Sequence, residues 1–226
     1  MTDEVTVYLV DDDDAIRDSL RFLFATVSIT VQSFASPYDF IARFDPVRPG
    51  CVILDLRMPE LNGIEVLTRL REQTKTIPVL VITGYGSAQA AVRAAKLGAV
   101  EFLEKPVNDD LLLERVQHWI DADVKFHEEY ARHRELQDRL ASLSRRERQV
   151  LDCVLAGMSN KEAAFALGIS AKAIEMYRSN LMKKMAAKTF VQLVRKVVGC
   201  IKCGEHQFVD NPPCLHPGGR SPPLWG

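Results

Sequence analysis

The 226-residue sequence has no run of eighteen or more apolar residues, which is the length that a membrane-spanning helix requires. Asp3 and Glu4 lie within its first ten residues, so the N-terminus does not resemble a secretory signal. Only five cysteines are present and they are unevenly spread, which argues against a secreted disulfide framework. These absences predict a cytoplasmic protein with no membrane partner.

The sequence also has little net charge, −1, but this small value hides an uneven distribution. Residues 1–120 contain 12 Lys and Arg against 18 Asp and Glu, whereas residues 144–203 contain 12 against 4. Dense positive charge over a short segment favours contact with phosphate backbones. The basic segment lacks an aromatic platform of the kind on which RNA bases stack, so DNA is favoured over RNA.

Residues 5–120 alternate between short apolar runs and amphipathic stretches of helical period. The runs are Val5–Val10, Ile29–Ser33, Cys51–Leu54, Val79–Ile82 and Val100–Leu103, and the helical patterns lie near 14–27, 37–44, 63–73, 87–97 and 107–120. Five repeats of strand and helix predict an α/β fold, a flavodoxin-like doubly wound parallel sheet with helices on both faces. Such folds bind ligands at the carboxyl ends of their strands.

From Ser144 onward the pattern is entirely helical. Serine or threonine followed three residues later by glutamate or glutamine marks three helix starts, at Ser144, Ser159 and Thr189, and Ser170 is suited to cap a fourth helix. The chain is therefore expected to continue with a small all-α four-helix domain.

The predicted organisation has four parts. Residues 1–120 form the α/β domain, residues 121–143 a helical linker that extends the fifth helix or stands alone, residues 144–203 the all-α domain, and residues 204–226 a disordered Pro- and Gly-rich tail. Possible zinc ligands are Cys200, Cys203, His206, Cys214 and His216, but their spacing fits no zinc finger well.

Chemically active side chains follow four of the five predicted strands. Asp11–Asp14 come after the first strand, Asp55 ends the third, Thr83 ends the fourth and Lys105 follows the fifth. Because parallel strands deliver these residues to one edge of the sheet, the clustered carboxylates need a cation, and Mg²⁺ suits oxygen ligands. Asp55 is then a candidate nucleophile for acyl-phosphate formation, with Lys105 neutralising the phosphoryl group and Thr83 donating to its oxygens. Within the acidic run, Asp13 and Asp14 are expected to cap the first helix rather than bind metal.

The segments VYLVDDDDAIR, VILDLRMPELNGIEVL, VITGYG and EFLEKP occur in the order seen in response-regulator receiver domains, which residues 5–120 resemble. The resemblance implies that a histidine kinase phosphorylates Asp55 and that Thr83 and Lys105 hold the phosphoryl group. It implies Phe102 as the aromatic switch residue and a cis Lys105–Pro106 peptide bond. The implied metal ligands are Asp11, Asp12, Asp55 and the backbone carbonyl of Arg57.

Residues 171–185 have the pattern of a DNA-recognition helix. A buried stripe is predicted on one face, formed by Ile174, Tyr177, Leu181 and Met185. The opposite, polar face is suited to the major groove. Candidate phosphate contacts are Lys161, Lys172 and Lys183, and candidate base contacts are Glu175, Met176, Arg178 and Ser179.

The stretch LSRRERQVLDCVLAGMSNKEAAFALGISAKAIEMYRSNLMKKM resembles the LuxR-type helix-turn-helix of FixJ-like and NarL-like regulators, over residues 143–198. Ala173 and Tyr177 stand where Thr and His are more usual, which affects the expected base contacts rather than the fold. With its receiver, the chain resembles a FixJ-like transcription factor. This implies a homodimer that forms on phosphorylation, binds double-stranded promoter DNA and acts with RNA polymerase, usually as an activator.

Two other functions remain open from the sequence. A metal-dependent phosphatase using Asp55 would need an acid two residues later, where Arg57 stands, so we do not expect an enzyme. A phosphorylation-independent DNA-binding scaffold would not need the complete set of Asp55, Thr83 and Lys105.

Overall fold

The computed structural model describes residues 5–74, 76–84 and 88–205. The chain divides into two compact units, the first of which reaches His127 while the second begins at Glu128, and each is described by itself. Within the described residues, no helix combines the length and the apolar character needed to cross a membrane.

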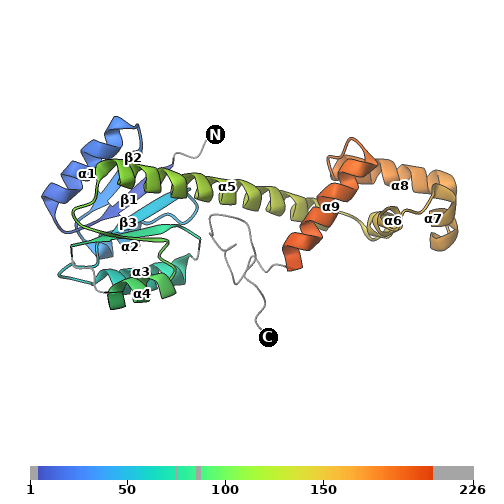
Figure 1. Ribbon diagram of the computed structural model, residues 1–226. Coiled ribbons are helices and arrows are strands. Elements are labelled where there is room, and N and C mark those ends of the chain that lie inside the picture. The colour runs from blue at the N-terminus through green and yellow to red at the C-terminus, as the bar shows by residue number, and fades with distance from the viewer. Residues whose placement is uncertain (1–4, 75, 85–87, 206–226) are drawn as a thin grey trace. The chain divides into compact units, whose positions relative to one another are not determined.

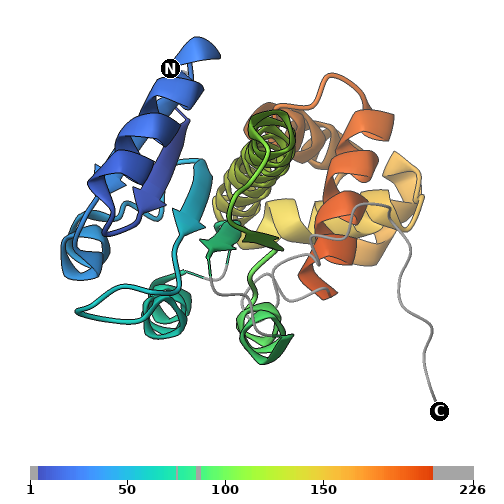
Figure 2. The ribbon, with the colours of Figure 1, turned by 60° about the vertical axis from the view of Figure 1, so that its left-hand side comes forward.

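The first unit alternates strands and helices as the sequence predicts. Its elements are β1 (Thr6–Val10), α1 (Asp14–Thr26), β2 (Thr30–Phe34), α2 (Pro37–Arg43), β3 (Gly50–Leu54), α3 (Gly63–Gln73), β4 (Val79–Thr83), α4 (Ala88–Lys96), β5 (Glu101–Glu104) and α5 (Asp109–Ala141). The described strands form one parallel five-stranded sheet in the order β2-β1-β3-β4-β5. Helices α1 and α5 cover one face and α2, α3 and α4 the other (Figures 1 and 2). The predicted flavodoxin-like α/β fold is confirmed.

Alternation along the strands builds the two cores. In β1, Val7 and Leu9 pack with Phe24 of α1 and Trp119 of α5. Tyr8 and Val10 point to the other face and pack in the core with α2 and α3. All five residues of β1, β3 and β4 are buried, because helices cover both faces of the sheet. The predicted helical stretch after residue 120 is continuous with the fifth helix, since α5 runs on to Ala141.

The second unit is helical and contains α6 (Arg145–Leu155), α7 (Asn160–Leu167), α8 (Ala171–Lys184) and α9 (Phe190–Glu205). Complete capping boxes at Ser144 and Ser159 begin α6 and α7, and Ser170 caps α8, as predicted. At the third predicted box, Thr189 accepts from the Gln192 backbone, but the Gln192 side chain accepts from Lys188 instead of closing the box.

The predicted stripe on α8 is confirmed, because Ile174, Leu181 and Met185 are fully buried and Tyr177 packs against the same core. Gly168 ends α7 with φ +65°, a left-handed conformation that glycine adopts without steric cost and that turns the chain towards α8. Helix α9 continues to Glu205, past the predicted domain end at residue 203. The tail from 206 lies outside the described residues, as do the side chains of the suggested zinc ligands.

Candidate functional site

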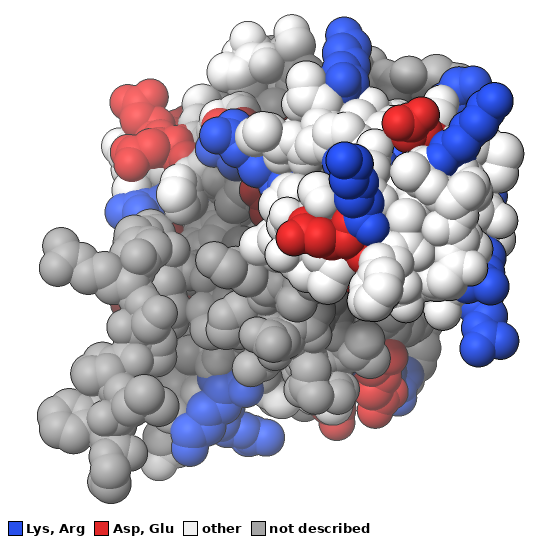
Figure 3. All heavy atoms as spheres, turned by 90° about the vertical axis from the view of Figure 1, so that its right-hand side faces the viewer, with Lys and Arg blue, Asp and Glu red and all other residues white. Residues whose placement is uncertain are grey.

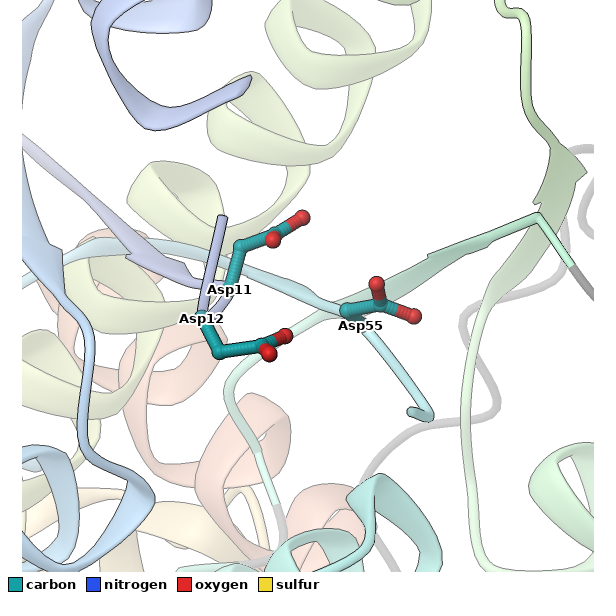
Figure 4. A group of neighbouring side chains, drawn as sticks. All are labelled: Asp11, Asp12 and Asp55. Carbon is teal, nitrogen blue, oxygen red and sulfur yellow. The ribbon is translucent and has the colours of Figure 1, made fainter. Parts of the chain in front are cut away.

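Three carboxylates meet at the carboxyl end of the sheet in the first unit (Figure 4). Strands β1 and β3 pair so that Val10 lies opposite Leu54, and the next residues, Asp11 and Asp55, therefore emerge side by side. This is where the strand order reverses, which is the ligand-binding point of such sheets. Asp11, Asp12 and Asp55 each offer an oxygen within 4.8 Å of the others, and of the three only Asp12 is exposed.

Lys105 joins two of these carboxylates directly. Its Nζ lies 2.7 Å from Asp11 Oδ2 and 2.8 Å from Asp55 Oδ2. The backbone N–H of Lys105 donates to the carbonyl of Thr83, which ties the end of β5 to the end of β4. The Lys105–Pro106 peptide bond is cis, as the resemblance implies.

Burial and hydrogen bonds to charged neighbours shift the pKa values of Asp11 and Lys105 in opposite directions. Burial raises the pKa of Asp11, and its hydrogen bond to Lys105 offsets this only in part. Burial lowers the pKa of Lys105, but the hydrogen bonds to Asp11 and Asp55 outweigh it and leave the pKa raised. The amine therefore stays cationic beside the two carboxylates.

The structure describes the remaining residues implied by the receiver resemblance as follows. Thr83 is fully buried at the end of β4. The backbone N–H of Arg57 donates to Asp55 Oδ1 at 3.1 Å, and its side chain is exposed. Phe102, in β5, is half-buried and packs against the core on the α3 and α4 side of the sheet. Asp13 caps α1 by accepting from Ala15 and Ile16, as expected.

A cleft of about 580 Å³ opens beside the cluster. Asp11, Asp55 and Lys105 line one part of it, and mostly apolar side chains, including Ile16 of α1 and Val107 after β5, line the rest. Asp55 is 7% exposed and lines this cleft.

Sequence patterns did not single out Arg17, which the structure brings to this site. Its Nη1 donates to the backbone carbonyl of Asp11 at 2.6 Å, and its guanidinium pairs with Asp14. The only signal was the spacing of Arg17 from Asp13 and Asp14 along α1, which places an acidic and a basic side chain on one helix face.

The carboxylate cluster fits a hard divalent cation. Its ligands are all oxygens, the clustered negative charge is only partly neutralised by Lys105, and one carboxylate faces solvent where water ligands have access. These features match Mg²⁺, which binds one or two carboxylates and keeps several waters.

In the second unit, most of the predicted DNA contacts form an exposed surface. Lys172, Glu175, Met176, Ser179 and Lys183 are exposed on α8, and Lys161 is exposed in the first turn of α7. Lys and Arg side chains project at several places on the face in Figure 3. Ser179 and Lys183 also line a groove of about 500 Å³, together with Asn160 and with Lys188, which sequence patterns did not single out.

Arg178 differs from the other predicted DNA contacts because its side chain is half-buried. Its Nη1 donates to Asn160 Oδ1 at 2.6 Å, and its guanidinium carbon lies 4.0 Å from the ring centroid of Phe190. The structure therefore does not place Arg178 with the exposed side chains of α8.

Comparisons with known proteins agree with this two-part architecture. Residues 7–117 match the response regulator receiver domain family, and residues 141–197 match the bacterial regulatory proteins of the luxR family. The chain is 43% identical to the transcriptional regulatory protein FixJ of Bradyrhizobium diazoefficiens, over 86% of this chain and 95% of the relative. It is 39% identical to FixJ of Azorhizobium caulinodans, over 86% and 92%.

A solved structure of the response regulator StyR is also similar to this chain. The match has a TM-score of 0.82 and 33% sequence identity, and it covers 87% of this chain and 99% of StyR.

Proposed function

Because the chain belongs to the FixJ-like two-component response regulators, with a receiver domain followed by a LuxR-type DNA-binding domain, we propose that phosphorylation of Asp55 by a histidine kinase controls its binding to promoter DNA. The observation that carries this proposal is Lys105, whose Nζ lies within 2.8 Å of both Asp11 and Asp55 beside a third carboxylate.

Phosphoryl transfer requires one bond to form and one to break. A carboxylate oxygen of Asp55 attacks the phosphorus of a phosphohistidine that enters the cleft beside α1, and the bond between phosphorus and the imidazole nitrogen breaks. Lys105 supplies a fixed positive charge to the phosphoryl oxygens, and Thr83 supplies a hydroxyl donor. Mg²⁺ held by Asp11, Asp12, Asp55 and the carbonyl of Arg57 would neutralise further charge on the phosphoryl group.

Phosphorylation of Asp55 changes the conformation of the receiver through neighbouring side chains. A phosphoryl group on Asp55 competes with the carboxylates for Lys105 and draws Thr83 towards its oxygens. Phe102 then repacks on the α4 side of the sheet, which favours a conformation that dimerises. Phosphorylation acts as a population shift, since it stabilises the active conformation more than the inactive one.

Dimerisation places two recognition helices on neighbouring half-sites, about 34 Å apart on duplex DNA. In each domain, Lys161, Lys172 and Lys183 contact phosphates, and the exposed side chains of Glu175, Met176 and Ser179 contact base edges. The bound dimer acts with RNA polymerase in the cytoplasm to activate transcription.

The proposal is tested by fluorescence-anisotropy titration of genomic DNA fragments, with and without acetyl phosphate and Mg²⁺. We expect the phosphoryl donor to raise the affinity or cooperativity of the wild type and to leave Asp55→Asn unchanged. If DNA binds equally in all four conditions, the receiver does not control DNA affinity and the chain is a phosphorylation-independent scaffold.

A further inference from the structure

The side chain of Arg178 connects three helices of the DNA-binding unit. Its partners are Asn160, the first residue of α7, and Phe190, the first residue of α9, while Arg178 itself lies in the second half of α8. A single guanidinium therefore links the beginnings of two helices to the recognition helix through contacts of 2.6 Å and 4.0 Å.

The two contacts use different parts of the guanidinium. Its edge donates a hydrogen bond to Asn160 Oδ1, and its face stacks on the Phe190 ring, where the cation is attracted by the electron density of the aromatic face. Lysine has no planar group that can make both contacts at once. Moving the guanidinium away from this position would break the hydrogen bond to Asn160 and the stacking on Phe190.

The contacts of Arg178 lie at a groove on the surface of the DNA-binding unit. The groove of about 500 Å³ between α7, α8 and the start of α9 is lined by Arg178 together with Ser179, Lys183 and Lys188. Ile174 and Leu181 hold the buried side of α8 in a core that also contains Ala163 of α7 and Leu193 of α9. The contacts of Arg178 add a second connection between the three helices, outside this core and at the groove.

We propose that Arg178 is a positioning residue for DNA binding, which holds the first turns of α7 and α9 against the recognition helix. This rests on the proposed DNA-binding function. The link sets the distance of Lys161, on α7, and Lys188, before α9, from the base-contacting side chains of α8. Arg178 thus acts on the bases through its neighbours.

Phe190 offers a test that leaves every charge in place. The full-length protein, treated with acetyl phosphate and Mg²⁺, is titrated against a duplex that the wild type has selected from a random library and against a scrambled duplex. Phe190→Leu should lower the affinity for the selected duplex roughly two- to fivefold, the range of a cation–π contact at a partly exposed site, and reduce the ratio between the two duplexes. Phe190→Tyr keeps an aromatic face and should restore both.

The matched control is Phe165→Leu, at a phenylalanine of α7 that is 92% exposed. This variant should bind like the wild type. Arg178→Ala should weaken binding at least as much as Phe190→Leu, and the double variant should be no weaker than Arg178→Ala alone, because Phe190 acts through Arg178. Selection from the random library with Arg178→Ala should recover the same preferred base at every position.

Three results would overturn the proposal. The first is a DNA affinity of Phe190→Leu equal to that of the wild type. The second is a double variant whose loss of affinity is the product of the losses in Arg178→Ala and Phe190→Leu. The third is a changed base preference at one position for Arg178→Ala, which would make Arg178 a base contact. If the wild type selects no duplex at all, the DNA-binding function fails and this proposal fails with it. If the wild type binds and Phe190→Leu binds equally, only the role of Arg178 fails.

Discussion

At the scale of single residues, the loop that carries the proposed phosphorylation site, Asp55, packs closely against a glycine. Gly63 begins α3 and donates its N–H to the carbonyl of Leu56, which brings the helix against the loop that carries Asp55. A Cβ at this position would overlap the backbone carbonyl of Asp55 and the Cα of Leu56. The close approach of two backbones therefore requires glycine.

We predict that Gly63→Ala lowers the free energy of unfolding by about 1–3 kcal/mol, the usual cost of forcing an extra carbon into a packed site. The loop must shift, so phosphorylation by acetyl phosphate should also slow. Urea unfolding and a phosphorylation time course measure the two effects. Gly84→Ala is the matched control for stability, since a Cβ there meets nothing within 4 Å, and an equal loss in both variants would contradict the explanation.

Asp123 is a buried carboxylate far from the strand ends that carry the acidic cluster. It lies on α5, is 1% exposed, and its Oδ2 accepts from the Gly50 backbone at 2.8 Å. The imidazole Nε2 of His127 lies 3.6 Å from the same oxygen. Burial raises the pKa of Asp123 from 3.8 to about 7.

A raised pKa means that the folded state binds the proton more tightly than the unfolded state. The associated stability is present below about pH 4 and is lost as the pH rises towards 7. Asp123→Asn, whose side-chain oxygen can still accept from Gly50, should remove this loss and be more stable than the wild type at pH 8, by on the order of 1–3 kcal/mol.

The measurement is urea unfolding at pH 5 and pH 8. Asp121→Asn is the control, because Asp121 is exposed on the same helix and both variants retain His127. A stability gain for Asp123→Asn that is the same at both pH values would show that ionisation of Asp123 is not the cause.

At the scale of elements, two helices of the DNA-binding unit begin with the same capping box in different surroundings. Glu147 of α6 is buried, and its Oε2 accepts from the Ser144 backbone and from Lys184 of α8, both at 2.7 Å. Glu162 of α7 makes the same bond to the Ser159 backbone but is exposed. The hydrogen bond to Lys184 holds the pKa of Glu147 below its usual value.

We predict that Glu147→Ala lowers the free energy of unfolding of this unit by about 1–2 kcal/mol, because it removes a cap and leaves Lys184 without this carboxylate. Glu162→Ala should cost less, since it removes only the cap. Thermal unfolding followed by circular dichroism at neutral pH compares the two. Equal losses would mean that the contact between α6 and α8 adds no stability beyond the cap.

At the scale of the whole molecule, the two units carry opposite charge and separate functions. The acidic cluster belongs to the first unit and the exposed lysines of α7 and α8 to the second. If phosphorylation in the first unit controls DNA binding by the second, the two units must be coupled, and the proposed coupling is dimerisation.

We predict that acetyl phosphate with Mg²⁺ converts the wild type to a species of twice the monomer mass in sedimentation velocity. Removing the metal with EDTA before the donor is added should abolish the change, because the clustered carboxylates then oppose the incoming phosphoryl charge. Asp55→Asn should stay monomeric under all conditions. A wild type that remains monomeric while its DNA affinity rises would show that phosphorylation acts without dimerisation.

Much of the architecture follows from patterns that are local in sequence. Strand and helix periods predicted the α/β fold, the capping boxes at Ser144 and Ser159 predicted two helix starts, and the apolar spacing on α8 predicted its buried stripe. These features depend on neighbouring residues and on which side of an element is apolar, so they can be recognised without coordinates. The grouping of Asp11, Asp55 and Lys105 was also predictable, because parallel strands end at one edge.

Only the tertiary structure determined which polar side chains remain exposed and which are held by distant partners. Arg178 and Ser179 are neighbours on one helix, yet Arg178 is held by Asn160 and Phe190 while Ser179 is exposed. Likewise, the partner of Asp123 is the backbone of Gly50, 73 positions away in the chain. Such contacts depend on how helices and strands pack in three dimensions. A polar side chain has several possible partners in the sequence, and the packing determines which of them lies within hydrogen-bonding distance.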